Sequence, residues 1–124
     1  MILVIGAAYA GKSAYVNSIL PEVALTDGET CAEDAVFHCA GIDHFHAYIR
    51  RQMEAGKEIS DLPDKILRKN PEVVIISDEI GYGIVPETEF LRAYRETTGR
   101  ILTDLAARAD KVYRVVCGIG TVIK

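Results

Sequence analysis

The residues at the start of the chain have the types and spacing that phosphate binding requires. Gly6 and Gly11-Lys12-Ser13 fit the pattern G-x-x-x-x-G-K-[ST]. In such a loop, successive backbone N–H groups form a concave nest for anionic oxygens, the lysine reaches the terminal phosphates and the serine hydroxyl can ligate Mg²⁺. The sequence therefore predicts that the chain binds a nucleotide. The predicted loop residues are Gly6, Ala7, Ala8, Tyr9, Ala10, Gly11, Lys12 and Ser13.

The sequence on either side of this loop supplies the context that the motif needs. Residues 2–5 are all apolar, which is typical of a strand that is buried on both faces in a parallel sheet. After the loop, Tyr15, Val16, Ile19 and Leu20 recur at helical spacing. A strand, a loop and a helix thus follow one another in the required order. A glycine-rich turn without a ligand is the weaker interpretation.

Two adjacent carboxylates, Asp78 and Glu79, follow the clearest internal strand, which we expect at residues 73–76. Ligands of open α/β sheets collect at the carboxyl ends of the strands. A carboxylate at this position can hold Mg²⁺, directly or through water, or accept the proton of a substrate hydroxyl. Because neighbouring side chains at a strand end point to opposite faces, we expect only one of the two to face the metal.

Three histidines are further candidates for chemistry. His38 ends a predicted strand at residues 35–39, at the same rim of the sheet, where a catalytic role competes with a simple structural hydrogen bond. His44 and His46 flank Phe45 at the start of a predicted helix. Since they point to different faces of that helix, they make a poor pair of metal ligands, and we interpret them first as surface residues.

The elements that position these residues alternate between strand and helix. After the first helix, the spacing predicts strands at residues 22–26 and 35–39. A helix that contains Phe45, Tyr48, Ile49 and Met53 follows, capped by Asp43 and ended by Gly56, and then a short helix at 60–70. After the strand at 73–76, we expect a long helix at 87–109 in which Gly99 marks a close contact, a strand at 112–117 and a short terminal strand. The predicted architecture is one domain spanning residues 1–124, a three-layer α/β fold with a mostly parallel sheet of about five strands.

One predicted connection does not fit a parallel sheet. Only residues 27–34 separate the strands predicted at 22–26 and 35–39, whereas a parallel crossover normally needs a dozen residues or more. Three explanations remain open: the two strands are not parallel neighbours, one of them is irregular, or a crossover helix is missing here.

Composition limits the classes of protein that the chain can belong to. It has 124 residues, of which 49% are hydrophobic and 26% charged, as expected for one globular domain. Its net charge of −4 without a basic block argues against duplex nucleic acid as a partner. No apolar run has the roughly 20 residues of a membrane span. The three cysteines form no C-x-x-C pair, which suits a reducing cytoplasm and gives no zinc signature.

Four segments of the C-terminal half, together with the phosphate loop, resemble a known family. Residues 77–87, 94–100, 109–113 and 116–120 are similar, in this order, to the bifunctional adenosylcobinamide kinase/adenosylcobinamide-phosphate guanylyltransferase family. The run E-[IV]-G-x-G-I-V-P within residues 77–87 is its most specific part. The resemblance implies a RecA-like nucleotide-binding fold, a cytoplasmic location and a homo-oligomer, specifically a trimer.

The resemblance also implies an activity in cobalamin biosynthesis. Family members transfer the terminal phosphate of ATP or GTP, with Mg²⁺, to the hydroxyl of the corrinoid substrate adenosylcobinamide, and then transfer GMP to that phosphate through a histidine–GMP intermediate. Carried over to this chain, Lys12 serves phosphoryl transfer, and Ser13 and Glu79 hold the metal, with Glu79 preferred to Asp78. The alternative from another class is a non-catalytic nucleotide-binding regulatory or accessory protein with this fold.

This chain departs from the family in three places. It lacks the segment between the second and third strands that carries the guanylylated histidine, and its phosphate loop lacks the family's arginine and serine. Where the family has an acidic residue before cysteine at the end of the third strand, this chain has His38-Cys39. A nucleophilic imidazole needs its second nitrogen held by a partner. His44 is the better remaining candidate, and we predict that no stable histidine–GMP adduct forms.

Overall fold

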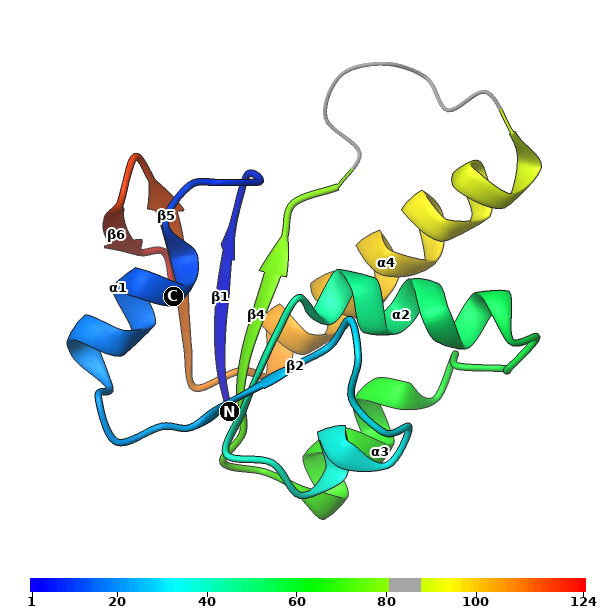
Figure 1. Cartoon of the computed structure of the whole chain (residues 1–124), viewed down its shortest axis with the longest axis horizontal. Helices are drawn as coiled ribbons and strands as arrows, with labels where there is room; N and C mark the ends of the chain where they lie inside the picture. Colours follow the sequence, from blue (N-terminus) through cyan, green and yellow to red (C-terminus); the bar gives the residue numbers. More distant parts are fainter. Residues whose placement is uncertain (81–87) are drawn as a thin grey trace.

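The structure is a computed structural model that describes residues 1–80 and 88–124 (Figure 1). Its elements, in chain order, are β1 (Ile2–Gly6), α1 (Lys12–Ile19), β2 (Leu25–Asp27), the 3₁₀ helix η1 (Ala35–Phe37), β3 (Gly41–Asp43), α2 (Phe45–Glu54), α3 (Leu62–Lys69), β4 (Val74–Asp78), α4 (Glu89–Arg108), β5 (Lys111–Val116) and β6 (Ile119–Val122). Within these residues, no helix combines the length and the apolar character that crossing a bilayer requires.

The strands form one sheet in the order β2-β3-β4-β1-β5-β6. All neighbouring pairs are parallel except β5 and β6, which form an antiparallel hairpin. The predicted fold class, a mostly parallel α/β sheet, is confirmed, with six strands instead of about five. Because β1 lies between β4 and β5, the loop that follows β1 emerges in the middle of the sheet.

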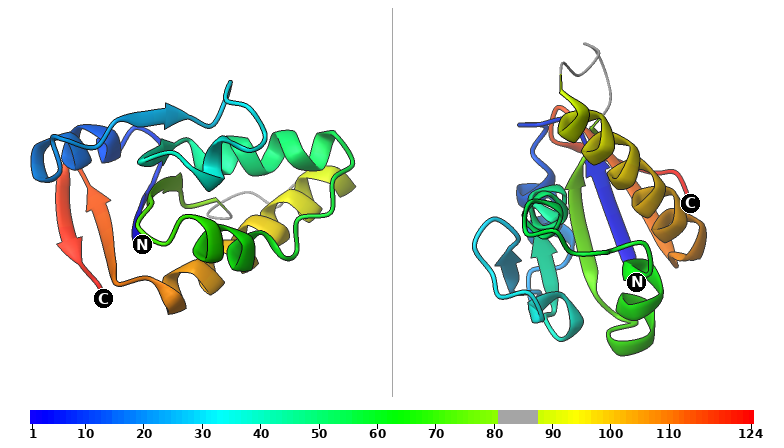
Figure 2. Two further views of the ribbon diagram at one scale, coloured as in Figure 1. Left: turned by 90° about the horizontal axis from the view of Figure 1, so that it is seen from below. Right: turned by 90° about the vertical axis from the view of Figure 1, so that its right-hand side faces the viewer.

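Helices cover both faces of this sheet, which gives the predicted three layers. On one face, Val16 of α1 packs in a cluster with Val4, Val74, Ile76 and Val115. On the other face, the larger core cluster joins β1, β3, β4 and β5 to apolar side chains of α2, α3 and α4. Figure 2 shows α1 across the strands from α3 and α4. Successive side chains of β4 alternate between the two clusters, as a buried strand requires.

The strand predicted at residues 35–39 is wrong. Ala35–Phe37 is a 3₁₀ helix, and the third strand is Gly41–Asp43. The side chain of Asn70 donates hydrogen bonds to the carbonyl oxygens of Val36 and Cys39, at 3.0 and 2.8 Å. These bonds satisfy backbone groups that would otherwise need a neighbouring strand. A short apolar run does not by itself distinguish a strand from a buried helical turn.

The corrected strand also resolves the short connection. β2 and β3 are parallel neighbours, with Leu25 paired to Gly41. The connection between them comprises the thirteen residues 28–40 and contains η1, which meets the length that a parallel crossover needs. Of the three open explanations, the one in which the two strands are not parallel neighbours is wrong. The difficulty came from the misplaced third strand.

The remaining boundaries differ in smaller ways. The strand predicted at 22–26 is Leu25–Asp27, and the long helix begins at Glu89, where the Thr88 hydroxyl accepts a hydrogen bond from the Leu91 N–H. Asp43 does not cap α2, because His44 is the N-cap residue and no side chain caps that helix. Residues 81–87, which hold most of the family-like run and the first predicted residue of the long helix, lie outside the described residues.

The two glycines expected to have special roles in helices behave differently. Gly56 ends the turn after α2 as predicted: it has φ +74°, its N–H donates to the Met53 carbonyl, and the Lys57 N–H donates to the Gln52 carbonyl. This is the Schellman pattern of a helix C-terminus. Gly99 in α4 marks no close contact, because a Cβ built there meets nothing within 4 Å.

We expect Gly99→Ala to stabilise the protein, since alanine is better than glycine in a helix interior by about 1 kcal/mol. Gly56→Ala is the matched control, because its Cβ also meets nothing within 4 Å but its φ is positive. That variant should lose about 1–2 kcal/mol. Thermal unfolding should therefore shift up by a few degrees for the first variant and down for the second. An unchanged or lowered melting temperature for Gly99→Ala would contradict this expectation and mean that α4 requires a residue without a side chain at position 99.

Candidate active site

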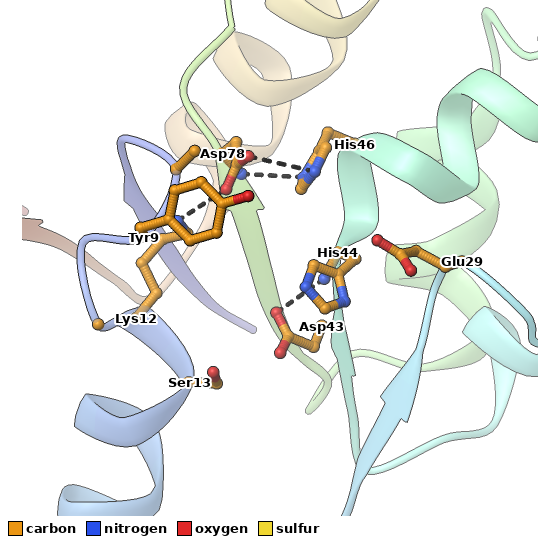
Figure 3. A pocket seen from close by; sticks show the side chains of 10 residues that line it. Tyr9, Lys12, Ser13, Glu29, Asp43, His44, His46 and Asp78 are labelled. Atoms are coloured by element: carbon orange, nitrogen blue, oxygen red, sulfur yellow. Dashed lines mark hydrogen bonds and ion pairs between the residues drawn. The ribbon is translucent and has the colours of Figure 1, made fainter.

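A cavity of about 480 Å³ opens at the carboxyl ends of β1, β3 and β4 (Figure 3). The phosphate loop forms one wall, and the segments that follow β2 and β3 form the opposite wall. The lining residues are Ala8, Tyr9, Gly11, Lys12, Ser13, Glu29, Asp43, His44, His46 and Asp78. This is the crevice where open α/β sheets bind their ligands. The structure thus brings Lys12, Ser13, Asp78 and His44 of the predicted site together, and adds His46, Asp43 and Glu29.

The phosphate loop has the backbone that its sequence predicts. Gly11 has φ +88° and Tyr9 has φ +61°, and Tyr9 is fully exposed. A Cβ at Gly6 would lie 2.6 Å from the carbonyl oxygen of Val115, so that position has no room for a side chain. Helix α1 begins directly after the loop without a side-chain cap. Its first N–H groups are therefore available to a phosphate.

The turn between β5 and β6 packs against the backbone of the phosphate loop at Ala10 and Gly11. The Gly118 N–H donates to the Ala10 carbonyl at 2.7 Å, and a Cβ at Gly11 would lie 3.2 Å from the Cα of Gly118. Both central residues of the turn, Cys117 and Gly118, have positive φ, as in a type I′ turn. The site therefore depends on backbone contacts with the far end of the chain.

Lys12 lies deep in the loop rather than free in solvent. Its side chain is only 8% exposed, and its Nζ donates to the Ala7 carbonyl and contacts Asp78 Oδ1, both at 2.7 Å. A lysine held in this way has its stem buried, and two of its three N–H donors are used by these contacts, which leaves one for a ligand. It can bind a phosphate oxygen with little loss of side-chain entropy.

Asp78 connects the loop to helix α2 through His46. The Asp78 N–H donates to His46 Nδ1 at 3.0 Å, and His46 Nε2 lies 3.3 Å from Asp78 Oδ2 (Figure 3). Since Nδ1 accepts, the proton of the neutral ring is on Nε2, the nitrogen within ion-pair distance of the carboxylate. Burial lowers the pKa of His46, although the charge on Asp78 opposes this. The Tyr94 hydroxyl, whose pKa burial raises to about 12, donates to the His46 carbonyl at 2.9 Å.

Glu79 points away from this cavity. Its backbone N–H donates to the Gly6 carbonyl at 2.8 Å, while its side chain pairs with Arg114 at 3.2 Å. The expectation that only one of the two carboxylates faces the loop is met, but that one is Asp78 rather than the preferred Glu79. The alternation of β4 explains this, because Asp78 follows Val74 and Ile76 on the face that α1 covers.

The histidines are placed differently from the sequence expectation. His38 is 68% exposed after η1 and is absent from the cavity wall, since it does not end a strand. His44 lies in the wall with φ +53°, its N–H bonded to Asp43 Oδ1 and its Nδ1 3.1 Å from Asp27 Oδ1. Burial lowers the pKa of His44, but the bond to Asp27 and the charges of Asp43 and Asp27 outweigh it, so the net pKa is raised.

The corrected third strand also changes one departure from the family pattern. β3 ends at the acidic residue Asp43, not at His38-Cys39. The resemblance implies an acidic residue followed by cysteine at this point, and Asp43 supplies the acidic residue but is followed by His44. A strand ending at Asp43 would also have placed His44 and His46 at the rim of the sheet. The misplaced strand concealed that signal.

The arrangement suits a magnesium-bound triphosphate. The Ser13 hydroxyl and the Asp78 carboxylate supply hard oxygen donors, which Mg²⁺ prefers. Lys12 and the N-terminus of α1 supply the positive potential that phosphates need. The donor set thus fits the predicted metal, with Asp78 in the place expected for Glu79.

Comparisons with known proteins cover most of the chain. The model of the family described as cobinamide kinase / cobinamide phosphate guanyltransferase matches residues 23–123. The chain is 39% identical over 77 residues to the bifunctional adenosylcobalamin biosynthesis protein CobU of Escherichia coli K12, and 40% identical over 77 residues to the protein of that name from Salmonella typhimurium LT2. Each alignment spans 62% of this chain and 42% of the relative. The family match begins after the phosphate loop. The assignment of that loop therefore depends on its sequence motif and its geometry.

Proposed function

The chain belongs to the cobinamide kinase / cobinamide phosphate guanyltransferase family, and from this premise we propose that it is a phosphotransferase of cobalamin biosynthesis. It transfers the terminal phosphate of ATP or GTP to the hydroxyl of adenosylcobinamide. The observation that carries this proposal is the contact between Lys12 Nζ and Asp78 Oδ1 at the base of the phosphate loop. That pair puts a cation for the phosphates beside a carboxylate for Mg²⁺.

Each residue of the site has a defined task in this proposal. The N–H groups at the start of α1 bind the phosphates, and Lys12 neutralises the charge that develops on the transferred group. Ser13 and Asp78 hold Mg²⁺, which when bound neutralises phosphate charge and orients the oxygens. His46 holds the Asp78 carboxylate and backbone in one orientation through its two ring nitrogens. Preorganised groups of this kind lower the barrier without moving during the reaction.

We propose that phosphoryl transfer proceeds without guanylyl transfer in this chain. Both ring nitrogens of His46 contact Asp78, so neither is free to attack a phosphate. His44 differs, because Asp27 holds its Nδ1 at 3.1 Å, which is the arrangement that a nucleophilic imidazole needs. The contacts of His46 support the expectation that no histidine–GMP adduct forms, and His44 is the residue at which the labelling experiment tests it.

The test is a turnover assay with ATP or GTP, Mg²⁺ and adenosylcobinamide. We expect ADP or GDP release that depends on the corrinoid, with a phosphorylated corrinoid as product. Tight Mg-nucleotide binding without acceptor-dependent release would contradict the proposal and support the alternative, a non-catalytic nucleotide-binding accessory protein. In parallel, GTP labelled in the α-phosphate should leave no acid-labile label on the protein. Label that His44→Asn abolishes would show that guanylyl transfer survives.

A further inference from the structure

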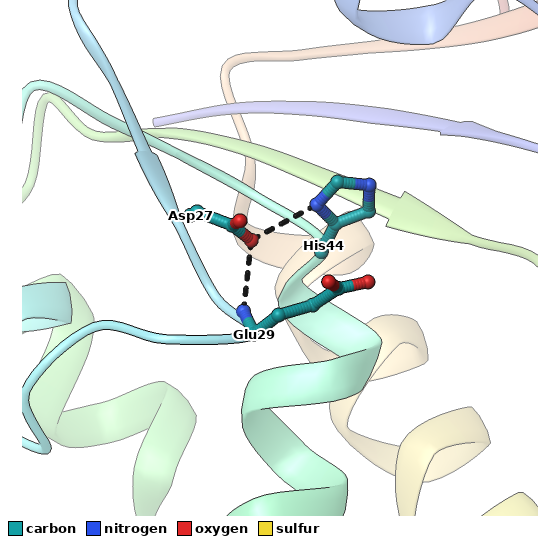
Figure 4. A group of neighbouring side chains, drawn as sticks. All are labelled: Asp27, Glu29 and His44. Atoms are coloured by element: carbon teal, nitrogen blue, oxygen red, sulfur yellow. Dashed lines mark hydrogen bonds and ion pairs between the residues drawn. The ribbon is translucent and has the colours of Figure 1, made fainter.

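A second group of metal-ligating side chains lies in the wall of the cavity opposite the phosphate loop. Asp27, Glu29 and His44 each offer one ligand atom, and these atoms all lie within 4.8 Å of one another (Figure 4). His44 Nδ1 lies 3.1 Å from Asp27 Oδ1. Ligand atoms around one ion in tetrahedral or octahedral coordination are separated by about 3–4 Å, given bonds near 2.1 Å. Small side-chain rotations would bring all three onto a common ion.

The backbone around this group is held in place by contacts outside it. Arg51 of α2 donates to the Gly28 carbonyl at 2.9 Å and to the Cys31 carbonyl at 2.8 Å. These bonds clamp the turn that carries Glu29. The Gly28 N–H donates to the Asp43 carbonyl at 2.8 Å and so fixes the end of β2 beside the end of β3. The end of β2 with the turn that follows it, which carries Asp27 and Glu29, and the start of α2, which carries His44, are thereby preorganised, and this reduces the cost of assembling a metal site.

The local charge also favours a cation. Asp27 and Glu29 face His44 from the end of β2, and Asp43 lies next to it on β3. Three carboxylates therefore lie around one imidazole, and their negative charge attracts a divalent cation.

We propose that Asp27, Glu29 and His44 form a binding site for a divalent transition-metal ion, separate from the Mg²⁺ expected at Ser13 and Asp78. One imidazole and two carboxylates are the ligands of ions such as Mn²⁺ or Zn²⁺, whereas Mg²⁺ prefers oxygen alone. Glu29 and His44 line the same cavity as the phosphate loop. An ion held there faces whatever molecule occupies the space above Lys12.

The test is Mn²⁺ binding to the nucleotide-free protein, measured from the electron paramagnetic resonance signal of free Mn²⁺. Mn²⁺ is the probe because it has little affinity for the cysteine thiols. We expect saturable binding of one ion, which Glu29→Gln and His44→Asn each weaken at least about tenfold. Asparagine keeps the positive φ of residue 44 at little cost. Because the experiment uses no nucleotide and no acceptor, its outcome is independent of the proposed phosphotransferase activity.

Two controls make the result specific. His38→Ala removes the other exposed histidine, which pairs with Asp34 at 3.7 Å and to which the described residues offer no third ligand. It should bind Mn²⁺ as the wild type does. Glu72→Gln, which removes an exposed carboxylate that does not line the cavity, should also leave this binding unchanged. Absence of saturable binding, or equal binding by wild type and Glu29→Gln while circular dichroism shows both folded, would overturn the proposal.

Discussion

Lys12→Ala is expected to remove most of the affinity for Mg-ATP and Mg-GTP and about 3–4 kcal/mol of transition-state stabilisation, a loss of 10²- to 10³-fold in kcat/KM. The reason is electrostatic. Among the described residues that line the cavity next to the loop, Lys12 is the one lysine or arginine, and it lies at the base of that loop beside the N-terminus of α1. Isothermal titration calorimetry with both nucleotides measures the binding effect.

Lys12→Ala should also lower the free energy of unfolding, because the Lys12 side chain is only 8% exposed and is paired with Asp78. Removing one partner of a mostly buried pair should cost about 1–3 kcal/mol. Lys12→Met keeps much of the buried stem and removes only the charge, so it separates loss of packing from loss of phosphate binding. Lys111→Ala, at an exposed lysine at the start of β5, is the neutral control. Wild-type affinity in Lys12→Met would exclude Lys12 from phosphate binding.

Asp78→Asn is expected to lower kcat/KM by 10² to 10³, on the order of 3–4 kcal/mol, and Glu79→Gln by less than about threefold. The two carboxylates are adjacent in sequence but differ in environment. Asp78 contacts Lys12 and His46 in the cavity, whereas Glu79 pairs with Arg114, which is 46% exposed. Because Arg114 is exposed to solvent, this ion pair is screened and contributes about 1 kcal/mol, although the Glu79 side chain is only 15% exposed.

A binding measurement tests the same difference without turnover. Wild type should bind GTP more tightly with Mg²⁺ than with a chelator present, and Asp78→Asn should lose this metal dependence. Lys12→Ala should weaken binding under both conditions, which distinguishes a phosphate ligand from a metal ligand. A larger loss of metal dependence in Glu79→Gln than in Asp78→Asn would restore Glu79 as the metal-binding residue.

The phosphate loop could be predicted from the sequence because it is local. Its glycines, lysine and serine lie within eight positions and between a strand and a helix that the apolar pattern shows clearly. The pair at Asp78 and Glu79 could be predicted because a strand of apolar β-branched residues must be central and its carboxyl end must face the site. Which of the two faces the cavity depends on which side chains of β4 point toward α1, and an all-apolar strand does not show this.

The cavity wall opposite the phosphate loop could not be predicted from the sequence, because its position depends on which residues form β3. The run from Ala35 to Cys39 is as apolar as a strand, but Asn70 satisfies its carbonyl groups from more than thirty positions away. No local pattern contains that contact. Once β3 is placed at Gly41–Asp43, the proximity of His46 to Asp78 and of His44 to Asp27 follows from the parallel register of β2, β3 and β4.

The bond between the Gly118 N–H and the Ala10 carbonyl joins residues 108 positions apart. The phosphate loop therefore acquires its final backbone only when the C-terminal hairpin has joined the sheet, which is a late event for contacts of such large sequence separation. Nucleotide affinity consequently reports completion of the whole fold. Ligand binding stabilises the chain against global unfolding, so amide hydrogens of the β5–β6 hairpin should gain as much exchange protection from bound nucleotide as those of the loop itself.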